Sequence, residues 1–281
     1  AGRGRPVPWD PVSRDRLERV HAPRYIDDVQ EFANSGGGAI EVDTVLSPAS
    51  YDVALLAAGA VCDATERVVR GEAPNALCLV RPPGHHALPA RPMGFCLFNN
   101  VATAARLALD ELELERVLIV DWDVHHGNGT QARFWEEPRV GFLSIHRWPF
   151  YPGSGAADET GGGEGRGTTR NLPVEFGISR HDYLTVFAEA LEEFAAAIRP
   201  ELVFVSAGFD SHRLDPIGGL GLETEDFASL TETVLDAADA HAGGRVISVL
   251  EGGYHPNALA EAVALHLGEM VRRSEDRDSG G

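Results

Sequence analysis

The sequence predicts a single α/β domain, spanning residues 1–281, in which helices pack on both faces of a mostly parallel sheet. Three observations support this fold class. A chain of 281 residues is long enough for one large domain and too short for two of that size. Apolar runs rich in Val, Ile and Leu alternate with segments of helical periodicity. These runs lead directly into loops rich in His, Asp and Gly, an order typical of parallel strands with a site at one edge.

Five short apolar runs are predicted to be strands of this sheet. They cover residues 76–80, 116–120, 140–145, 202–206 and 245–250. The loops that follow them begin RPPGHH, DWDVHHGNG, HRWPFYPGSG, AGFD and EGGYH. Because ligands of doubly wound α/β folds bind beyond the carboxyl ends of the strands, we expect these loops to meet at one site.

Helices are predicted before, between and after these strands. They cover residues 51–69, the segment from Ser179 to Pro200, the segment from Thr224 to Gly243, and residues 256–272. In the first of them, Val53 and Leu56 are expected on the buried, apolar face. Ser179 and Thr224 are each expected to cap the helix that follows, because a hydroxyl oxygen can accept a backbone N–H of the first turn.

The charge and cysteine content exclude several classes of protein. The formal net charge is −19, and all 24 basic residues are arginines, so nucleic acid is an unfavourable partner and a cationic partner a favourable one. No apolar run approaches the roughly 18 residues needed to span a bilayer, and the first residues lack the apolar stretch of a signal peptide. The three cysteines, without a CxxC spacing, indicate free thiols. We therefore expect a cytoplasmic protein without a membrane or nucleic-acid partner.

Carboxylates and a histidine follow the predicted strand 116–120 at a spacing of two. Asp121, Asp123 and His125 therefore share one face at the strand end. Asp123 and His125 can bind one divalent cation, and Asp210, at another strand end, is the natural third ligand. Three protein ligands with a vacant fourth position are typical of a catalytic zinc site.

Two adjacent histidines and a tyrosine follow other predicted strands. His85 and His86 come after a rigid Pro-Pro-Gly turn and can act as a general acid/base pair. Asp121, which the metal does not need, can accept the N–H of one of them and fix its tautomer. Tyr254, after two glycines, can donate a hydrogen bond to a developing oxyanion. Each feature alone also suits ordinary loop packing, so the interpretation depends on their combination.

Aromatic side chains lie on two of the converging loops, at Gly94-Phe95 and at Phe150-Tyr151. They can line a narrow tube for an aliphatic chain, or simply pack the loops. Cys96 lies beside them without a partner that would make it a nucleophile, and we interpret it as structural.

Taken together, these motifs resemble those of the histone deacetylases, and most closely those of class II and the bacterial amidohydrolases. The similarity spans residues 16–270 and is carried by RPPGHHALPARPMGFCLFNN, IVDWDVHHGNGTQ, LSIHRWPFYPGSG, SAGFDSHRLDPIGG and LEGGYH. It implies the arginase–deacetylase fold, a three-layer α/β/α domain around a mostly parallel, eight-stranded sheet. Relative to that pattern, the segment before Trp9 is short. Asn128 replaces the aspartate of class I members, as is usual in class II.

The resemblance also implies the occupants and roles of the site. It implies Zn²⁺ at Asp123, His125 and Asp210, with His85, His86, Tyr254 and Asp121 as catalytic groups. It implies substrate contacts at the Gly94 carbonyl, at Phe95 and Tyr151 on either side of an acyl-lysine tunnel, and at Asp43 on the rim. It implies a structural K⁺ near Asp121, Asp123, the His125 carbonyl and Ser144.

The function expected from this resemblance is zinc-dependent removal of acetyl groups from acetyl-lysine or related acylated amines. Acetylpolyamines are an alternative substrate that suits the acidic surface, although Ile217 at the expected pocket mouth supplies no carboxylate for a cationic tail. A two-manganese arginase-type hydrolase is a second alternative, but Gly127 stands where its last ligand would be. A non-enzymatic acyl-lysine-binding protein is a third, and the full set of catalytic residue types disfavours it.

Overall fold

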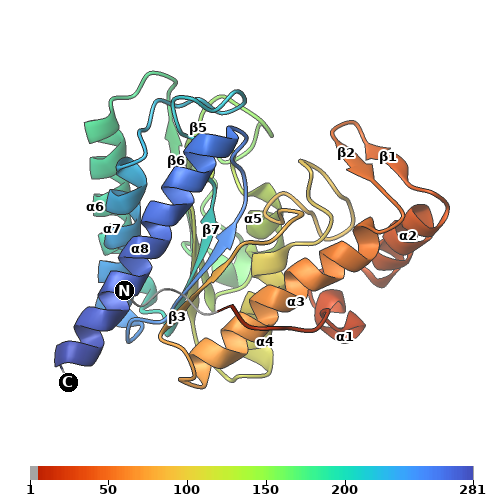
Figure 1. Ribbon diagram of the computed structural model, residues 1–281, viewed down its shortest axis with the longest axis horizontal. Helices are drawn as coiled ribbons and strands as arrows, with labels where there is room; N and C mark the ends of the chain where they lie inside the picture. Colours follow the sequence, from red (N-terminus) through yellow and green to blue (C-terminus); the bar gives the residue numbers. More distant parts are fainter. Residues whose placement is uncertain (1–5, 281) are drawn as a thin grey trace.

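The computed structural model describes residues 6–280 and contains a six-stranded, fully parallel sheet between two layers of helices (Figure 1). The strands lie in the order β3 (Asn75–Cys78), β8 (Val246–Leu250), β7 (Leu202–Ala207), β4 (Val117–Asp121), β5 (Val140–Arg147) and β6 (Thr169–Val174). The central strands β4 and β7 are buried along their whole length, as expected for continuous apolar runs covered on both faces. The α/β fold class predicted from the sequence is confirmed.

The helices form two layers, each with its own apolar cluster. On one face lie α3 (Ser50–Val69) and α4 (Asn100–Asp110), extended by α1 (Arg14–Glu18) and α2 (Pro23–Asn34). On the other lie α6 (Arg180–Ile198), α7 (Asp226–His241) and α8 (Pro256–Gly280). The short helix α5 (Asn128–Phe134) follows the loop after β4. None of the helices between residues 6 and 280 is long and apolar enough to cross a membrane.

The sheet differs from the eight-stranded one that the resemblance implied. Within the described residues it has six strands, and the two others, β1 (Gly38–Glu41) and β2 (Thr44–Leu46), pair only with each other. Their connection, Val42-Asp43, is two residues long, which favours a local antiparallel hairpin over parallel pairing in a distant sheet. The hairpin projects beside α2, away from the sheet (Figure 1).

The predicted buried face of α3 is wrong at two positions. Val53 and Leu56 on α3 are 43% and 39% exposed, and the buried face instead includes Tyr51, Ala54 and Ala58. The N-terminal segment crosses this face so closely that a β-carbon added at Gly59 would lie 2.1 Å from the Asp10 carbonyl oxygen.

Of the two predicted helix caps, one is present and the other is not. The Ser179 hydroxyl accepts the Asp182 N–H at the start of α6, as expected. Thr224 does not cap α7, which begins at Asp226. Its hydroxyl lies 3.3 Å from His212 Nε2 instead, so a tertiary contact replaces the cap.

Candidate active site

The polar loops meet at the carboxyl edge of the sheet, as parallel strands require. Asp121 ends β4, Asp210 follows β7, and Tyr254 follows β8. The histidine loop after β3 joins them: His85 Nδ1 lies 2.9 Å from Asp121 Oδ2. The convergence expected from the sequence is therefore present.

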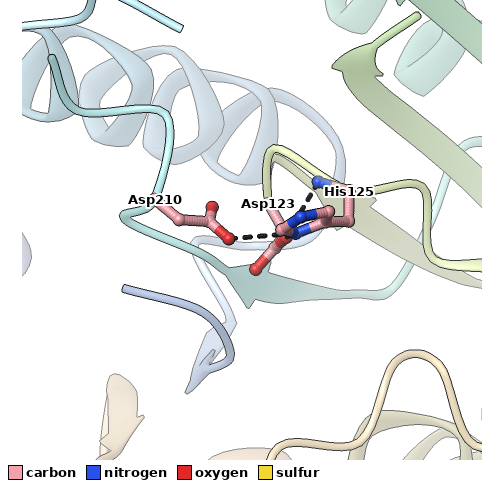
Figure 2. Close-up of side chains that lie close together, drawn as sticks. All are labelled: Asp123, His125 and Asp210. Atoms are coloured by element: carbon pink, nitrogen blue, oxygen red, sulfur yellow. Dashed lines mark hydrogen bonds and ion pairs between the residues drawn. The ribbon is translucent and has the colours of Figure 1, made fainter. Parts of the chain in front are cut away.

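Asp123, His125 and Asp210 form a compact, buried triad (Figure 2). Their candidate ligand atoms all lie within 4.8 Å of one another. His125 Nδ1 lies 3.0 Å from Asp123 Oδ1 and 3.1 Å from Asp210 Oδ2. A local hydrogen bond stabilises this loop: the backbone N–H of His125 donates to Asp123 Oδ1 at 2.9 Å.

Backbone groups from neighbouring segments orient the two carboxylates. The Val124 N–H donates to Asp210 Oδ1 at 2.9 Å, and the Gly252 N–H donates to Asp123 Oδ2 at 2.8 Å. Only a glycine fits at the second position: a β-carbon on Gly252 would lie 2.4 Å from Asp210 Oδ2. The backbone of the segment that follows β8 therefore packs directly against the triad.

The donor set of the triad fits a divalent cation. Asp210 Oδ2 is buried, and its contact in the triad is His125 Nδ1 at 3.1 Å, which is itself a candidate ligand atom. Burial disfavours charge on His125, yet Asp123 and Asp210 outweigh it and raise the pKa of this imidazole to about 10. Burial and the neighbouring Asp123 charge raise the pKa of Asp210. A bound cation would offset the repulsion between the Asp123 and Asp210 carboxylates, as the proton on His125 does in this structure.

The two adjacent histidines have different partners and therefore different protonation. Burial opposes charge on His85, but Asp121 and Asp123 raise its pKa well above the usual value. Burial and the charge of His85 lower the pKa of His86 well below it. His86 Nδ1 donates to Asn128 Oδ1 at 2.7 Å, and this neutral partner does not compensate a positive charge. His85 is thus the cation of the pair, and neutral His86 keeps a proton-free Nε2.

Tyr254 and the predicted tunnel residues surround the triad and the histidines. The Tyr254 ring contacts Phe95 edge-on, with centroids 5.9 Å apart, and the Tyr151 ring contacts His86 edge-on at 5.2 Å. Phe95 and Tyr151 remain partly exposed, so these rings lie where the site opens to solvent. Burial, followed by the charges of Asp123 and Asp210, raises the pKa of Tyr254. The phenol therefore stays protonated and able to donate.

Asp43 lies in the turn of the β1–β2 hairpin and links two walls of the opening. Its Oδ1 accepts the Gly94 N–H at 3.0 Å and the Thr44 hydroxyl at 2.9 Å. Its Oδ2 accepts the Tyr151 hydroxyl at 2.8 Å. The hairpin thereby carries a carboxylate to the opening, where the resemblance implied a substrate contact, but internal donors already engage both oxygens.

Ser144, the remaining expected cation ligand, is buried on β5 directly across the β4–β5 ladder from Asp121. Its hydroxyl lies 2.9 Å from His146 Nδ1. Ser144 and Asp121, two of the ligands that the resemblance implied for a second cation, thus lie on neighbouring strands.

Two buried acidic residues of the site were missed. Asp215 accepts the Tyr254 N–H at 2.7 Å and the Ile217 N–H at 2.9 Å. Glu251, which follows β8, accepts the Gly84 N–H at 2.7 Å. The signal for Glu251 was present in the sequence, since this acidic residue directly follows an apolar run, as Asp121 does.

Comparisons with known proteins agree with this geometry. A family model described as histone deacetylase domain matches residues 3–270. The chain is 40% identical over 245 residues to a histone deacetylase-like amidohydrolase of Pseudomonas aeruginosa, covering 87% of this chain and 64% of that protein. It is 43% identical over 273 residues to the polyamine deacetylase HDAC10 of Homo sapiens, covering 92% and 40%. The crystal structure of the HDA15 HD domain superposes with a TM-score of 0.88 at 35% identity, covering 94% and 74%. The chain thus spans less than two thirds of the length of both curated relatives.

Proposed function

The chain belongs to the histone deacetylase family, and from this premise we propose that it is a metal-dependent deacetylase acting on acetylated lysine side chains or related acylated amines. The observation that carries the proposal is the buried Asp123–His125–Asp210 triad next to a histidine pair in which His85 bonds to a carboxylate and His86 to an amide. Triad, base and phenol lie at one edge of the sheet, which is the set that amide hydrolysis requires.

We propose Zn²⁺ as the ion held by Asp123, His125 and Asp210, since two carboxylates and an imidazole are ligands that zinc accepts. When bound, the ion supplies Lewis-acid polarisation of the acetyl carbonyl. The close approach of the buried Asp210 Oδ2 to His125 Nδ1, both candidate ligand atoms, supports a cation at this position.

The side chains around the triad carry the proton transfers. His86, neutral and with a proton-free Nε2, accepts a proton from the attacking water. His85, held as a cation by Asp121, stabilises the negative charge that develops on the acetyl group. The Tyr254 hydroxyl donates a hydrogen bond to the former carbonyl oxygen. The proton on His86 then passes to the leaving amine, so that acetate and a free amine result.

The opening of the site fits an aliphatic acyl-amine chain. Phe95 and Tyr151 are proposed to flank this chain, and the Gly94 carbonyl to accept the N–H of the scissile amide. Asp43 is proposed to receive a backbone N–H of the substrate at the rim. Its Oδ2 would then accept both the substrate N–H and the Tyr151 hydroxyl, since each carboxylate oxygen can accept two hydrogen bonds.

The substrate class is tested by turnover of acetyl-lysine peptides and acetylpolyamines with the zinc-loaded enzyme. We expect higher kcat/KM for the peptides, because exposed Ile217 offers no carboxylate to a cationic tail. Acetylpolyamines are the second candidate, supported by the relative named polyamine deacetylase. Chelator-treated enzyme is the control. Absence of turnover on every acylated amine with zinc bound would contradict the proposed function.

A structural K⁺ site is proposed near Asp121, Asp123, the His125 carbonyl and Ser144. A bound ion stabilises only the native state, by about 2.7 kcal/mol at 100 times its Kd. We therefore expect millimolar KCl to raise Tm by several degrees more than tetramethylammonium chloride, whose cation is too large for the site. Both salts screen the net charge of −19 equally, so identical curves would refute a K⁺ site.

The cellular setting proposed for the chain is the cytoplasm, without a nucleic-acid or membrane partner. Support comes from three free, buried thiols and from the strongly acidic composition.

A further inference from the structure

A buried glutamate, Glu251, lies directly behind the histidine loop and takes no part in the chemistry described above. It follows the last residue of β8, is 7% exposed and has both carboxylate oxygens engaged. Oε2 accepts the backbone N–H of Gly84 at 2.7 Å and that of His85 at 3.2 Å. Oε1 accepts the Ser206 hydroxyl at 3.0 Å.

These bonds connect three segments that each contribute to the site. Gly84 and His85 belong to the loop that carries the histidine pair, and Ser206 belongs to the end of β7 that leads to Asp210. The residue after Glu251 is Gly252, whose N–H orients Asp123. A single side chain thus ties the histidine loop to the two strand ends beside the metal triad.

The histidine loop is held from the opposite side by packing. A β-carbon on Gly84 would lie 2.5 Å from the backbone nitrogen of Asn100 and 2.9 Å from the Phe98 carbonyl oxygen. The turn therefore sits between the start of α4 and the Glu251 carboxylate. Without the carboxylate, two buried N–H donors would lose their acceptor, and the turn would have contacts on one side only.

Burying this acid has an energetic cost that its partners offset only in part. Burial raises the pKa of Glu251 to about 7, against the lowering effect of His85 and of the Gly84 N–H. An apolar residue would fill the same space without that cost. An apolar residue, however, cannot accept the backbone N–H groups of Gly84 and His85.

We propose that Glu251 is a positioning residue that fixes the direction of His85 and His86 by accepting the two backbone N–H groups of their loop. The proposal rests on the deacetylase function proposed above. The role depends on the length of the side chain, which places an acceptor oxygen at the loop, and not on its negative charge.

Reach and charge are separated by two substitutions. Glu251→Gln keeps the length and one acceptor oxygen for the loop, while its NH2 group can donate to the Ser206 oxygen. Glu251→Asp keeps the charge but withdraws the oxygens from the loop. We expect Glu251→Gln to retain a kcat close to the native value. We expect Glu251→Asp to lose about 10²-fold in kcat, the loss that misplacing a catalytic group by about 1 Å can cause, with zinc content unchanged.

Amide hydrogen exchange of a peptide covering the histidine loop gives a readout that needs neither substrate nor metal. The Gly84 and His85 amides should stay protected in Glu251→Gln and exchange faster in Glu251→Asp. Glu251→Met, of similar length but without an acceptor, gives the same comparison if the aspartate variant is too unstable to purify. Glu137 is the matched control, because it is half-buried, bonded to arginines and located before β5 at the opposite edge of the sheet.

The Glu137 variants are expected to lose stability without a change in kcat. Native kcat in Glu251→Asp, or equal losses in Glu251→Gln and Glu251→Asp, would overturn the positioning role. A native enzyme without deacetylase activity would refute the proposed function, and the exchange comparison would still decide whether Glu251 holds the loop.

Discussion

Asp210→Ala is expected to abolish both zinc retention and deacetylase activity. The substitution removes one of three ligands, so its effect on metal affinity should exceed the roughly 10–100-fold that loss of an outer-sphere partner causes. The metal-free variant should differ little in stability from the metal-free native chain, because repulsion by Asp123 opposes the bonds that Asp210 makes to the Val124 N–H and to His125. Zinc analysis after dialysis, activity assays and the Tm with and without zinc measure these effects.

Asp226→Ala is the control for removing a buried carboxylate. Asp226 is the first residue of α7, forms an ion pair with Arg180 and lies outside the triad. This variant should lose stability but keep its zinc and the zinc-dependent rise in Tm. Stoichiometric zinc in Asp210→Ala would show that the third ligand is another residue.

Tyr254→Phe is expected to lower kcat by about 10²–10³-fold, the usual loss for one oxyanion donor. KM, zinc content and Tm should change little. The reason is that, within residues 6–280, the Tyr254 hydroxyl makes no hydrogen bond that the substitution would remove. Steady-state kinetics with an acetyl-lysine peptide measure the effect.

Tyr25→Phe provides the same chemical change at a structural position. The buried Tyr25 hydroxyl donates to the Leu97 carbonyl at 2.5 Å, so its loss should cost about 0.5–1.5 kcal/mol of stability and leave kcat unchanged. If Tyr254→Phe and Tyr25→Phe have the same kcat, Tyr254 does not act on the oxyanion.

The sequence alone predicted the parts of the fold that follow from local patterns. All five predicted strands are present within two residues of their expected ends, because continuous apolar runs bounded by polar loops have few alternatives. The edge strand β6, Thr169–Val174, was missed, since its mixture of polar residues and a proline suits a strand covered on one side only. The helix α4, Asn100–Asp110, was also missed, because it follows directly on a motif interpreted as a loop.

The candidate site divides in the same way. Asp123 and His125 were found through their spacing, and Asp210 through its place at another strand end. Asp215 and Glu251 act by accepting N–H groups from loops 39 and 167 residues away, and no spacing in the sequence encodes such contacts. The close approach of the N-terminal segment to α3 at Gly59 is likewise a long-range contact, which helical periodicity cannot indicate.

The origin of the triad from separate strands has a consequence for the order of assembly. The bond that orients Asp210 joins it to Val124, 86 residues away, and the bond that orients Asp123 spans 129 residues to Gly252. An unfolded chain cannot present these ligands together, so β4, β7 and β8 must pair before an ion finds its site. The ion therefore cannot nucleate folding, as it does in a zinc finger. The proposed ion is therefore expected to act on the rate of unfolding, and the ions available to the folded chain are expected to decide which metal the site binds.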